Sequence, residues 1–478
     1  MRRLSPVGVG SDPGPPRGED IHMRNIAIIG SGLVGALAAN GLRKAGHQVT
    51  LYSDRTPEQW LQSKPTGAAA RFELSLQLER ELGLNHWDAQ VPWGEGAHLT
   101  VCPSPRNRLL TLTGRLSHPF QAVDMRMQIH RWMLDLVERG GRLELQSVTV
   151  EGLERIAAAH DLTLVAAGKA ELGKLFERDA ARSVYDAPRR HLALVCLQGP
   201  RMRFDNLPLV PVKFNVFPEA GEIFYMPFLH KDVGQSWACL VEAKPGGPLD
   251  RFRDATSGEQ VVERLQGVFR ELLPWDAAWL EPARLSDPQG WLVGAVTPTV
   301  RRPVARLSSG HEVMALGDTM MAFDPIGGQG ANNGYKQVRN LLQCVAEHGD
   351  RPFDGAWMTA TFERFYARHG EPAYSFNNLL LEPINGAAQA LLMAQYGSDG
   401  RTDNRSPQQR LANAFADNFN DAASLTPVMR DAGRMHRFIS RTTGGPWLKA
   451  VARGGLSVAR GQLRQRLGMD PRHPPRLA

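Results

Sequence analysis

The sequence contains only four cysteines among its 478 residues, and no two of them form a C-x-x-C pair. Disulfide frameworks and structural zinc sites depend on closely spaced cysteines, so we expect neither, and we expect no metal. So few cysteines fit a reducing, cytoplasmic location. No stretch approaches the roughly 20 apolar residues that cross a membrane as a helix. Arg2 and Arg3 precede proline and glycine instead of an apolar segment, which argues against a signal peptide.

A net positive charge is also confined to one region. The whole chain has a net charge of +7, but residues 434–478 hold ten Lys or Arg and one Asp, a net of +9, which leaves −2 for the rest. The basic character therefore belongs to a C-terminal tail, and the main body gives no sign of binding nucleic acid. Residues 1–22 lack apolar periodicity and are rich in proline and glycine, so we expect a disordered extension before Met23.

The most informative feature that is present is a G-x-G-x-x-G motif formed by Gly30, Gly32 and Gly35. In a dinucleotide site the first glycine makes a tight turn, and the second lets the backbone approach a pyrophosphate. The third lets the helix pack close to the strand. The free N–H groups at the start of the helix then point toward the phosphates, so Leu33 and Val34 join the predicted cofactor-binding residues.

The motif stands in the order of elements that such a domain requires: a strand pattern at 26–29, a helix at 33–44 and a strand at 48–53. A ribose-binding acid usually ends the second strand. Ser53 stands there instead, and Asp54 and Arg55 follow it. We predict that Asp54 reaches the ribose and that Arg55 lies against the adenine or a phosphate. The alternative is that both are solvated loop charges.

A second glycine-rich segment lies far along the chain. An apolar strand pattern ends in Gly317 and Asp318, and Pro325 then opens a glycine-rich loop that runs into a helix pattern. Glycines let backbone touch a planar ring, and a helix N-terminus stabilises negative charge such as that of a reduced flavin. This segment resembles the GD…PxxGQGxN segment of flavoprotein monooxygenases.

That resemblance implies that the aspartate bonds a ribityl hydroxyl of FAD and that the loop lies along the isoalloxazine ring. The following helix points its N-terminus at the pyrimidine end of the ring. The residues assigned to FAD in this way are Gly317, Asp318, Pro325, Gly328, Gln329, Gly330, Ala331 and Asn332.

Two further stretches agree with a flavin domain. Residues 161–168 read DLTLVAAG and fit its third strand, with Gly168 at the cofactor. Residues Asp124–Arg139 have helical spacing, and Arg126 at their head matches an arginine near the flavin phosphates and ring edge in this family. Taken alone, Arg126 would be read as a surface arginine.

One absence narrows the family. One-component aromatic hydroxylases of this fold carry an Asp-Gly pair after the third strand, and none follows Gly168 here. The chain is similar instead to the styrene and indole monooxygenases, which are two-component epoxidases, over nearly all of residues 24–420. The motifs that carry this resemblance are AxGKxxLGKxFE (Ala166–Glu177), VDMRM (Val123–Met127), YSDR (Tyr52–Arg55), GDTMMAFDPIGGQGAN (Gly317–Asn332) and DNFN (Asp417–Asn420).

The resemblance implies a division of labour between two proteins. A flavin reductase makes reduced FAD from NADH, and the oxygenase component uses it with O2 to form a C4a-hydroperoxide. The distal oxygen then adds to a small aromatic substrate: an aromatic alkene, an indole or a sulfide. The cofactor supplies the chemistry while the protein orients the substrate and excludes water, so no catalytic triad is expected. A homodimer is implied on the same grounds.

We predict that the substrate pocket comes from the antiparallel sheet and from Thr66–Glu95, and that Pro325 and its loop limit the ring face. Ala69 stands near the position of a pocket asparagine of the family, and this departure puts styrene itself in question. His98 aligns with a family histidine near the pocket, although a lone histidine is more often structural. The aromatic candidates for the pocket, which are equally suited to the core, are Phe214, Phe217, Phe224, Tyr225, Phe228 and Trp237.

The predicted fold is α/β, with a Rossmann-type FAD-binding domain, an antiparallel β-sheet substrate domain and a helical C-terminal region. Strand-like runs separated by turn residues place the antiparallel sheet after residue 188. The predicted parts are 24–188 and 301–345 for FAD, 189–300 for the substrate, 346–445 for the helical region and 446–478 for a basic amphipathic tail.

The tail from 447 to 467 can form one helix with an apolar and a basic side. Such a helix lies on a membrane or docks on an acidic partner such as the reductase, and the alternative is a solvated extension without a partner. Gly454 and Gly455 would weaken it. The apolar side holds Leu448, Ala452, Ala459, Leu463 and Leu467, and the basic side holds Lys449, Arg453, Arg460 and Arg464.

Two other interpretations stay open from the sequence. The chain could be another FAD-dependent oxidoreductase of the same fold, such as a hydroxylase, an N-oxygenase or a reductase. A halogenase is less favoured because the WxWxIP motif of flavin halogenases is absent. The chain could also be a non-catalytic flavin-binding protein, since fold alone does not decide function.

Overall fold

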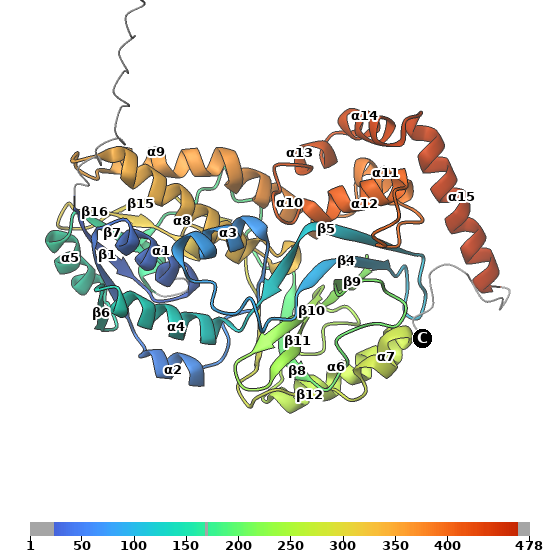
Figure 1. Cartoon of the computed structure of the whole chain (residues 1–478), viewed down its shortest axis with the longest axis horizontal. Coiled ribbons are helices and arrows are strands. Elements are labelled where there is room, and N and C mark those ends of the chain that lie inside the picture. Colours follow the sequence, from blue (N-terminus) through green and yellow to red (C-terminus); the bar gives the residue numbers. More distant parts are fainter. Residues whose placement is uncertain (1–22, 168–170, 467–478) are drawn as a thin grey trace, which may run out of the picture.

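The computed structural model describes residues 23–167 and 171–466. A sheet flanked by helices occupies one end of the molecule, a larger sheet lies in the middle, and a group of helices occupies the other end (Figure 1). The α/β fold class predicted from the sequence is confirmed. No helix among the described residues is both long and apolar enough to span a bilayer.

The first sheet has six strands, and all of its neighbouring pairs are parallel except the pair at one edge. Its central strands are short apolar runs without alternation, as expected for strands that are covered on both faces. In spatial order the strands are β15 (Val304–Arg306), β16 (Glu312–Ala315), β7 (Leu162–Val165), β1 (Asn25–Ile29), β2 (Gln48–Ser53) and β6 (Arg142–Leu145).

Helices cover this sheet, and two of them begin at the glycine-rich segments. These two are α1 (Leu33–Lys44) and α8 (Gln329–His348), which pack against each other. The predicted helix at 124–139 is confirmed as α4, which Asp124 caps by accepting a hydrogen bond from the backbone N–H of Arg126. Besides α1 and α8, the helices of this region are α2 (Pro57–Gln62), α3 (Glu73–Leu82), α4 (Met125–Glu138), α5 (Val150–Ala159) and α9 (Gly355–Phe365).

The second sheet has nine strands and includes the four strands predicted after residue 188. It also takes in three strands from earlier in the chain, within the range assigned to the first FAD part. One contact between the two groups, β4 with β9, is parallel. In spatial order the strands are β12 (Arg284–Leu285), β8 (His191–Gln198), β11 (Gly234–Ala243), β10 (Gly221–His230), β9 (Pro211–Phe217), β4 (Gly94–Val101), β5 (Leu110–Ala122) and β3 (Ala70–Arg71), and β13 (Trp291–Gly294) pairs with β8.

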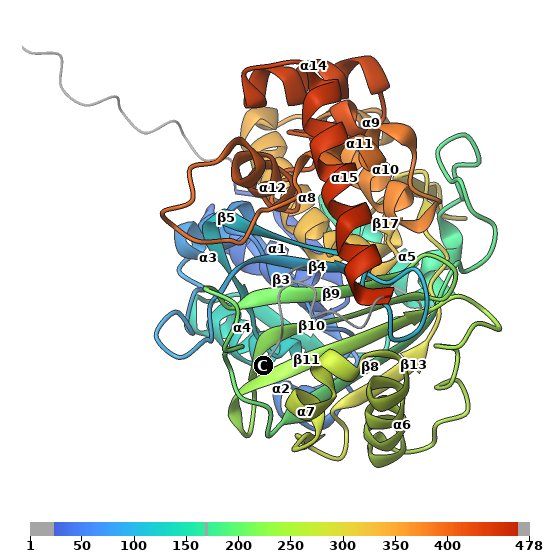
Figure 2. The same ribbon diagram turned by 90° about the vertical axis from the view of Figure 1, so that its right-hand side faces the viewer.

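The two faces of this sheet pack into different cores because successive side chains along a strand point to opposite faces. Phe224 and Leu240 belong to the core shared with β1 and α1. Tyr225 and Cys239 belong to a second core with α6 (Gly258–Leu272) and α7 (Pro274–Leu280), which lie on the far side of the sheet (Figure 2).

The C-terminal third is helical, as predicted, and α12 covers the outer part of β5. The approach is close: a Cβ at Gly114 of β5 would lie 2.3 Å from the carbonyl oxygen of Ala412. A two-stranded ladder of β14 (Thr299–Val300) and β17 (Met321–Ala322) completes the structure. The helices are α10 (Glu371–Leu381), α11 (Gly386–Ala394), α12 (Pro407–Asp417), α13 (Thr426–Met429), α14 (Ala432–Thr443) and α15 (Trp447–Arg466).

The tail helix α15 runs without interruption through Gly454 and Gly455, so the expected weakening does not break it. Packing gives the reason for the first glycine: a Cβ at Gly454 would lie 2.0 Å from the carbonyl oxygen of Met393 on α11. Gly455 has no such neighbour. The predicted apolar side is not the side that packs, because Leu448 and Leu463 are exposed while Val458 is buried.

Candidate functional site

The three motif glycines occupy the positions that their expected roles require. Gly30 has φ +106°, and a Cβ there would lie 2.6 Å from the carbonyl oxygen of Ala166. A Cβ at Gly35 would lie 1.9 Å from the carbonyl oxygen of Gly30, so only glycine allows α1 to approach the turn. At Gly32, by contrast, no atom of the described chain beyond the adjacent residues lies within 4 Å of the Cβ position. Protein backbone therefore fills the space beside Gly30 and Gly35, whereas the space beside Gly32 is free for a ligand.

The two glycine-rich segments meet through Val34. A Cβ at Gly317 would lie 3.3 Å from Val34, and a Cβ at Gly334 would lie 2.4 Å from it. The backbone N–H of Gly317 donates to the side-chain oxygen of Gln337 on α8, 2.7 Å away. The start of α1, the turn after β16 and the first turns of α8 thus form one unit. The exposed Asp318 follows directly after Gly317 on this turn.

The third strand joins the same unit. The backbone N–H of Leu316 donates to the carbonyl oxygen of Val165, so β7 and β16 end side by side. Ala166, the next residue after β7, contacts Gly30. The predicted cofactor residue Gly168 lies outside the described residues.

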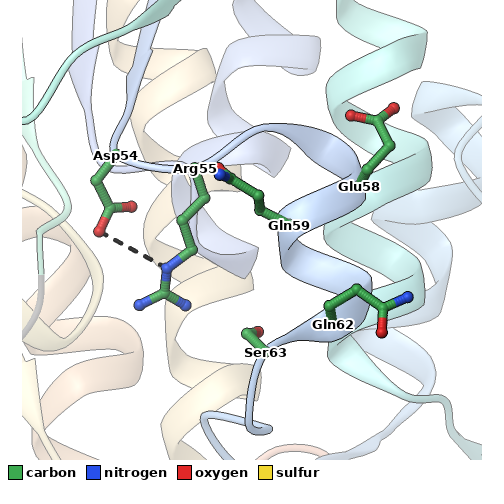
Figure 3. Close-up of a pocket in the computed structure, with 6 residues that line it drawn as sticks. All are labelled: Asp54, Arg55, Glu58, Gln59, Gln62 and Ser63. Carbon is green, nitrogen blue, oxygen red and sulfur yellow. Dashed lines mark ion pairs between the residues drawn. The ribbon is translucent and has the colours of Figure 1, made fainter.

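The end of β2 opens into a hollow of about 460 Å³ that Asp54, Arg55 and Ser63 help to line (Figure 3). The carboxylate of Asp54 pairs with Arg55 at 3.7 Å and is 57% exposed. Arg55 also lies over the ring of Trp60 at 4.7 Å. Ser53 is different: it is buried, and its hydroxyl is held by the hydroxyl of Ser31 at 2.6 Å and by the carbonyl oxygen of Arg55. Asp54 and Arg55 therefore remain the groups open to a ligand.

The flavin-type loop begins with a tight turn. Residues Pro325–Gly327 form one turn of 3-10 helix, whose backbone N–H at Ile326 donates to the Asp324 carboxylate. Gly328 follows with φ +59° and precedes α8. The partly exposed residues of this loop and of the helix start are Pro325, Gly328, Gly330 and Ala331. No atom of the described chain lies within 4 Å of a Cβ placed at Gly330.

The side chain of Asn332 is occupied by the protein itself. Its oxygen accepts hydrogen bonds from the backbone N–H of Phe72 and the hydroxyl of Ser75, at 3.1 and 2.8 Å. Its nitrogen donates to the carbonyl oxygens of Ala70 and Gly328. Asn332 thus holds the start of α3, and the residue is 0% exposed.

Several buried polar atoms around this loop have no hydrogen-bond partner in the described part of the chain. They belong to Gln329, Asn333, Gln337 and Asn377, whose side chains are at most 3% exposed. Folded proteins rarely leave such atoms without a partner. Together with the open Cβ positions at Gly32 and Gly330, they fit a polar ligand that passes from the first glycine turn to the second.

Arg126 is buried in an ion-pair network. Its guanidinium donates to Asp124 at 2.7 Å and to Asp287 at 2.9 Å, and His230 contacts both Arg126 and Asp287. It also donates to the carbonyl oxygen of Ser63, a residue of the hollow beside β2. Arg126 therefore ties α4 and the edge of the hollow to β10 and to the loop before β13.

Metal-type ligand spacing occurs once among the described residues, at His230, Asp232 and Asp287. The Arg126 guanidinium already supplies a positive charge at Asp287. Burial alone would raise the pKa of Asp287, but the hydrogen bonds from His230 and Arg126 hold it below its ordinary value. This carboxylate is thus neutralised by the protein, and no metal is needed to explain it.

The predicted pocket residues separate onto two faces. Phe214, Phe224 and Phe228 pack in the core that the second sheet shares with β1 and α1. The rings of Phe214 and Phe224 lie 5.1 Å apart. Phe217, Tyr225 and Trp237 lie in the core with α6 and α7. Only the first three are therefore candidates for a pocket that faces the cofactor loop.

His98 belongs to the other face. It is 1% exposed, contacts the hydroxyl of Thr113 at 2.8 Å and pairs in register with Lys213 of β9. Burial and the charge of Lys213 lower the pKa of His98 well below its ordinary value, so it is neutral. Ala69, by contrast, is half-buried directly before β3.

The DNFN motif carries contacts that sequence reasoning did not assign. Phe419 packs against Phe72 and Phe214, and its carbonyl oxygen accepts a hydrogen bond from Gln329. Asn420 accepts a hydrogen bond from the backbone N–H of Leu74 at the start of α3. The motif thus fastens the helical region to the flavin-type loop.

Comparison with known proteins adds a sequence match and a fold match. Residues 168–278 match the family described as "Styrene monooxygenase A putative substrate binding domain". The chain is 29% identical over 315 residues to "Styrene monooxygenase StyA" of Pseudomonas fluorescens, which covers 65% of this chain and 74% of that protein.

Two solved structures illustrate the fold match. A triple mutant of the flavin-dependent brominase Bmp2 has a TM-score of 0.57 at 14% identity and covers 87% of this chain and 100% of its own. The p-nitrophenol 4-monooxygenase PnpA from Pseudomonas putida has a TM-score of 0.52 at 14% identity and covers 86% of this chain and 98% of its own. At these identities the two structures establish the fold alone.

Proposed function

We propose that this chain, whose sequence is similar to that of the styrene monooxygenases, is the oxygenase component of a two-component FAD-dependent monooxygenase. A separate flavin reductase would supply reduced FAD, with NADH used only by that partner. The observation that carries the proposal is the meeting of the two glycine-rich segments at Val34, which brings a dinucleotide turn and a flavin-type loop into one unit. The absence of an Asp-Gly pair after the third strand supports the external supply of electrons.

Each part of the site would have a separate task. The hollow beside β2 would hold the adenosine end of FAD between Asp54 and Arg55, and the open turn at Gly32 would pass the pyrophosphate. Asp318 would bind the ribityl chain. The ring would lie along the Pro325 loop, where the N-terminus of α8 stabilises negative charge. Bound reduced FAD would supply the electrons and the site of O2 activation.

The substrate would be a small aromatic alkene, indole or sulfide. Phe214, Phe224 and Phe228 offer an aromatic surface on the sheet face that packs toward the flavin region. Ala69 offers a methyl group where the family has an amide, which favours a substrate other than styrene. No group in this set acts as a nucleophile, so the protein's role is to orient the substrate and to exclude water.

The proposal is tested by single-turnover mixing without a reductase. The protein, loaded with one equivalent of photoreduced FAD and without NADH, is mixed with 18O2-saturated buffer and styrene, indole or a thioether, with halide absent. One 18O atom in the product, which is an epoxide from styrene, an oxygenated indole or a sulfoxide, would establish that the protein is an oxygenase. Full reoxidation of FAD with hydrogen peroxide as the product for every substrate would contradict it. Turnover with NADH alone would contradict the two-component arrangement.

A further inference from the structure

We propose that the side chains of Glu242 and Asp324 share one proton, and that this shared proton positions the turn that begins at Pro325. The pairing is argued from the burial of both carboxyl groups, from the absence of other donors at their free oxygens and from their contact with each other. Its link to the cofactor rests on the proposed function, because Pro325 is placed beside the flavin only there.

Both carboxyl groups of the pair are buried, and three of their four oxygens have no hydrogen-bond donor in the described chain. Glu242 on β11 and Asp324 are both 0% exposed. Neither carboxylate oxygen of Glu242 meets an N–H or O–H donor of the described chain, and the same holds for one oxygen of Asp324. The two carboxyl groups lie within hydrogen-bond reach of each other. Two adjacent buried carboxylates cannot both stay ionised. One of them must therefore be protonated and donate a hydrogen bond to the other.

The surrounding charges do not replace this proton. Glu222 faces Glu242 across the β10–β11 pair, and Arg190 binds Glu222 through its Nε at 2.5 Å. Arg190, which also acts on Glu242 and Asp324, is therefore bound to an acid outside the pair. Lys244 is the other cation that acts on Glu222. Burial, together with Asp324, raises the pKa of Glu242 well above 4.5, and burial raises that of Glu222 to about 7.

The pair sits where it can set the loop. The second oxygen of Asp324 accepts a hydrogen bond from the backbone N–H of Ile326 at 3.2 Å and so caps the turn that contains Pro325. Glu242 belongs to the sheet that carries the aromatic face. A donor on Glu242 therefore holds Asp324, and through it Pro325, at a fixed distance from that face. Loss of the proton would leave two like charges between sheet and loop.

Two variants with side chains of similar length test whether Glu242 acts as a hydrogen-bond donor or only fills space. Glu242→Gln keeps an N–H donor toward Asp324, whereas Glu242→Met keeps the chain length without a donor. We expect Glu242→Gln to bind FAD within about twofold of the unchanged protein and Glu242→Met to bind it at least tenfold more weakly, which is about 1.4 kcal/mol. Equal FAD affinity of the two variants would overturn the positioning role.

The proton itself is tested in the protein without FAD. The infrared carbonyl stretch of buried protonated carboxyl groups should be present at neutral pH and should lose intensity in Glu242→Gln, where Glu222 still contributes to it. Its absence from the unchanged protein, or an unchanged intensity in the variant, would overturn the proposal. The unfolding temperature of the unchanged protein should fall as pH rises above 4.5, because the folded state holds the proton longer, and Glu242→Gln should show a smaller slope, to which Glu222 still contributes. These readouts do not depend on whether the enzyme oxygenates anything.

A second, independent observation concerns α15, whose surface divides into three sectors. The inner sector packs on the body through Trp447, Val451, Gly454 and Val458. The second sector is apolar and open: Leu448, Leu456 and Leu463 are 61%, 63% and 59% exposed. The third sector is basic and also exposed, with Lys449, Arg453 and Arg460. The sequence of α15 contains no acidic residue.

We infer that this open face of α15 docks on an anionic lipid surface. An apolar stripe beside a row of cations needs an occupant that is apolar next to negative charge, which a bilayer with anionic headgroups provides along the whole helix of roughly 30 Å. A second copy of α15 fits less well because it would bring two basic rows together. Figure 2 shows that α15 runs along the outside of the molecule.

Vesicle flotation of the full chain tests this inference. Binding to phosphatidylglycerol vesicles, with little binding to phosphatidylcholine and loss at high salt, is the expected result. Leu456→Glu should abolish it, while Val184→Glu, at another exposed apolar position, should not. No binding to anionic vesicles, or equal binding by Leu456→Glu, would overturn the inference. So would a Leu456-dependent complex with a second copy or an acidic protein in the absence of lipid binding.

Discussion

Val34 on α1 lies so close to Gly334 on α8 that a Cβ at position 334 would come within 2.4 Å of the Val34 side chain. One contact therefore joins two segments that are 300 positions apart in the sequence. Valine has a stiff, branched side chain, so the contact cannot relax by a rotation alone. The distance between the two glycine-rich turns is fixed by the side chain that stands between them.

Gly334→Ala should therefore push α8 away from α1. The expected cost is about 1–3 kcal/mol of unfolding free energy, as for overpacked cores, together with weaker FAD binding. Urea unfolding and FAD titration measure both. Adding Val34→Ala should restore most of the loss because it removes the clashing methyl groups. A double variant no better than Gly334→Ala would show that the contact does not set the spacing.

Two glycines of the same motif should behave in opposite ways. Gly35→Ala places a Cβ 1.9 Å from a backbone oxygen and should prevent stable folding. Gly32→Ala meets no protein atom within 4 Å, so the unfolding free energy should change by less than about 0.5 kcal/mol. FAD affinity should nevertheless fall at least tenfold, or about 1.4 kcal/mol, if a pyrophosphate passes this point. Unchanged FAD affinity in a folded Gly32→Ala protein would place the pyrophosphate elsewhere.

Arg126→Met should destabilise the protein strongly because it leaves Asp124 and Asp287 buried without their cation. Breaking a buried pair by removing one partner costs about 3–5 kcal/mol. Circular dichroism during urea unfolding measures this. Arg126→Lys keeps a charge but not the fork geometry, so we expect an intermediate loss. If Arg126 also acts on the flavin phosphates, FAD affinity of Arg126→Lys should fall by more than its stability does.

The ion pairs of Asp287 should make the stability of the protein depend on pH in acid. Its pKa lies below 3.8 in the folded state because hydrogen bonds from His230 and Arg126 outweigh burial. A lowered pKa contributes stability that is present above the unfolded value and is lost as pH falls through the folded one. Unfolding measured from neutral pH downward should show a steeper loss below about pH 4 in the unchanged protein than in Asp287→Asn. Parallel curves for the two proteins would contradict this assignment.

The adjacent glycines of α15 give a matched pair outside the site. Gly454→Ala should lift α15 from α11 because its Cβ would lie 2.0 Å from a carbonyl oxygen. Gly455→Ala meets nothing within 4 Å and should stabilise the helix by about 0.5–1 kcal/mol. Hydrogen exchange of the α15 amides should therefore speed up in the first variant and slow down in the second. Exchange that changes equally in both would show that α15 is not docked in this way.

The sequence predicted best where one residue has one physical task. The spacing of Gly30, Gly32 and Gly35 predicted a strand, a turn and a helix, and the helix and second strand have the expected bounds. The four strands from His191 to Ala243 alternate between two buried faces, which made the antiparallel layer visible. The glycine pair in α15 was harder, because a clash with Met393 is not local.

What sequence reasoning missed depends on contacts between distant segments. The strands β3, β4 and β5 stand before the predicted boundary but hydrogen-bond within the second sheet. The side chain of Asn332, a predicted cofactor residue, contacts Phe72, Ser75 and Ala70, and the motif alone does not indicate these contacts. Glu242 gave no signal at all, because a glutamate in a strand is ordinarily a solvated residue.

The order of strands in the first sheet also governs how the chain can fold during synthesis. The edge of β7 is paired by β16, which leaves the ribosome about 150 residues later. At about 5–20 residues per second this means roughly 10–30 s in which an apolar edge strand has no neighbour on that side. We therefore expect a chaperone that covers exposed strand edges to bind the nascent chain. Mutations that slow the folding of the second sheet, whose strands β8–β13 lie between β7 and β16 in the sequence, should lower the yield of folded protein more than its final stability.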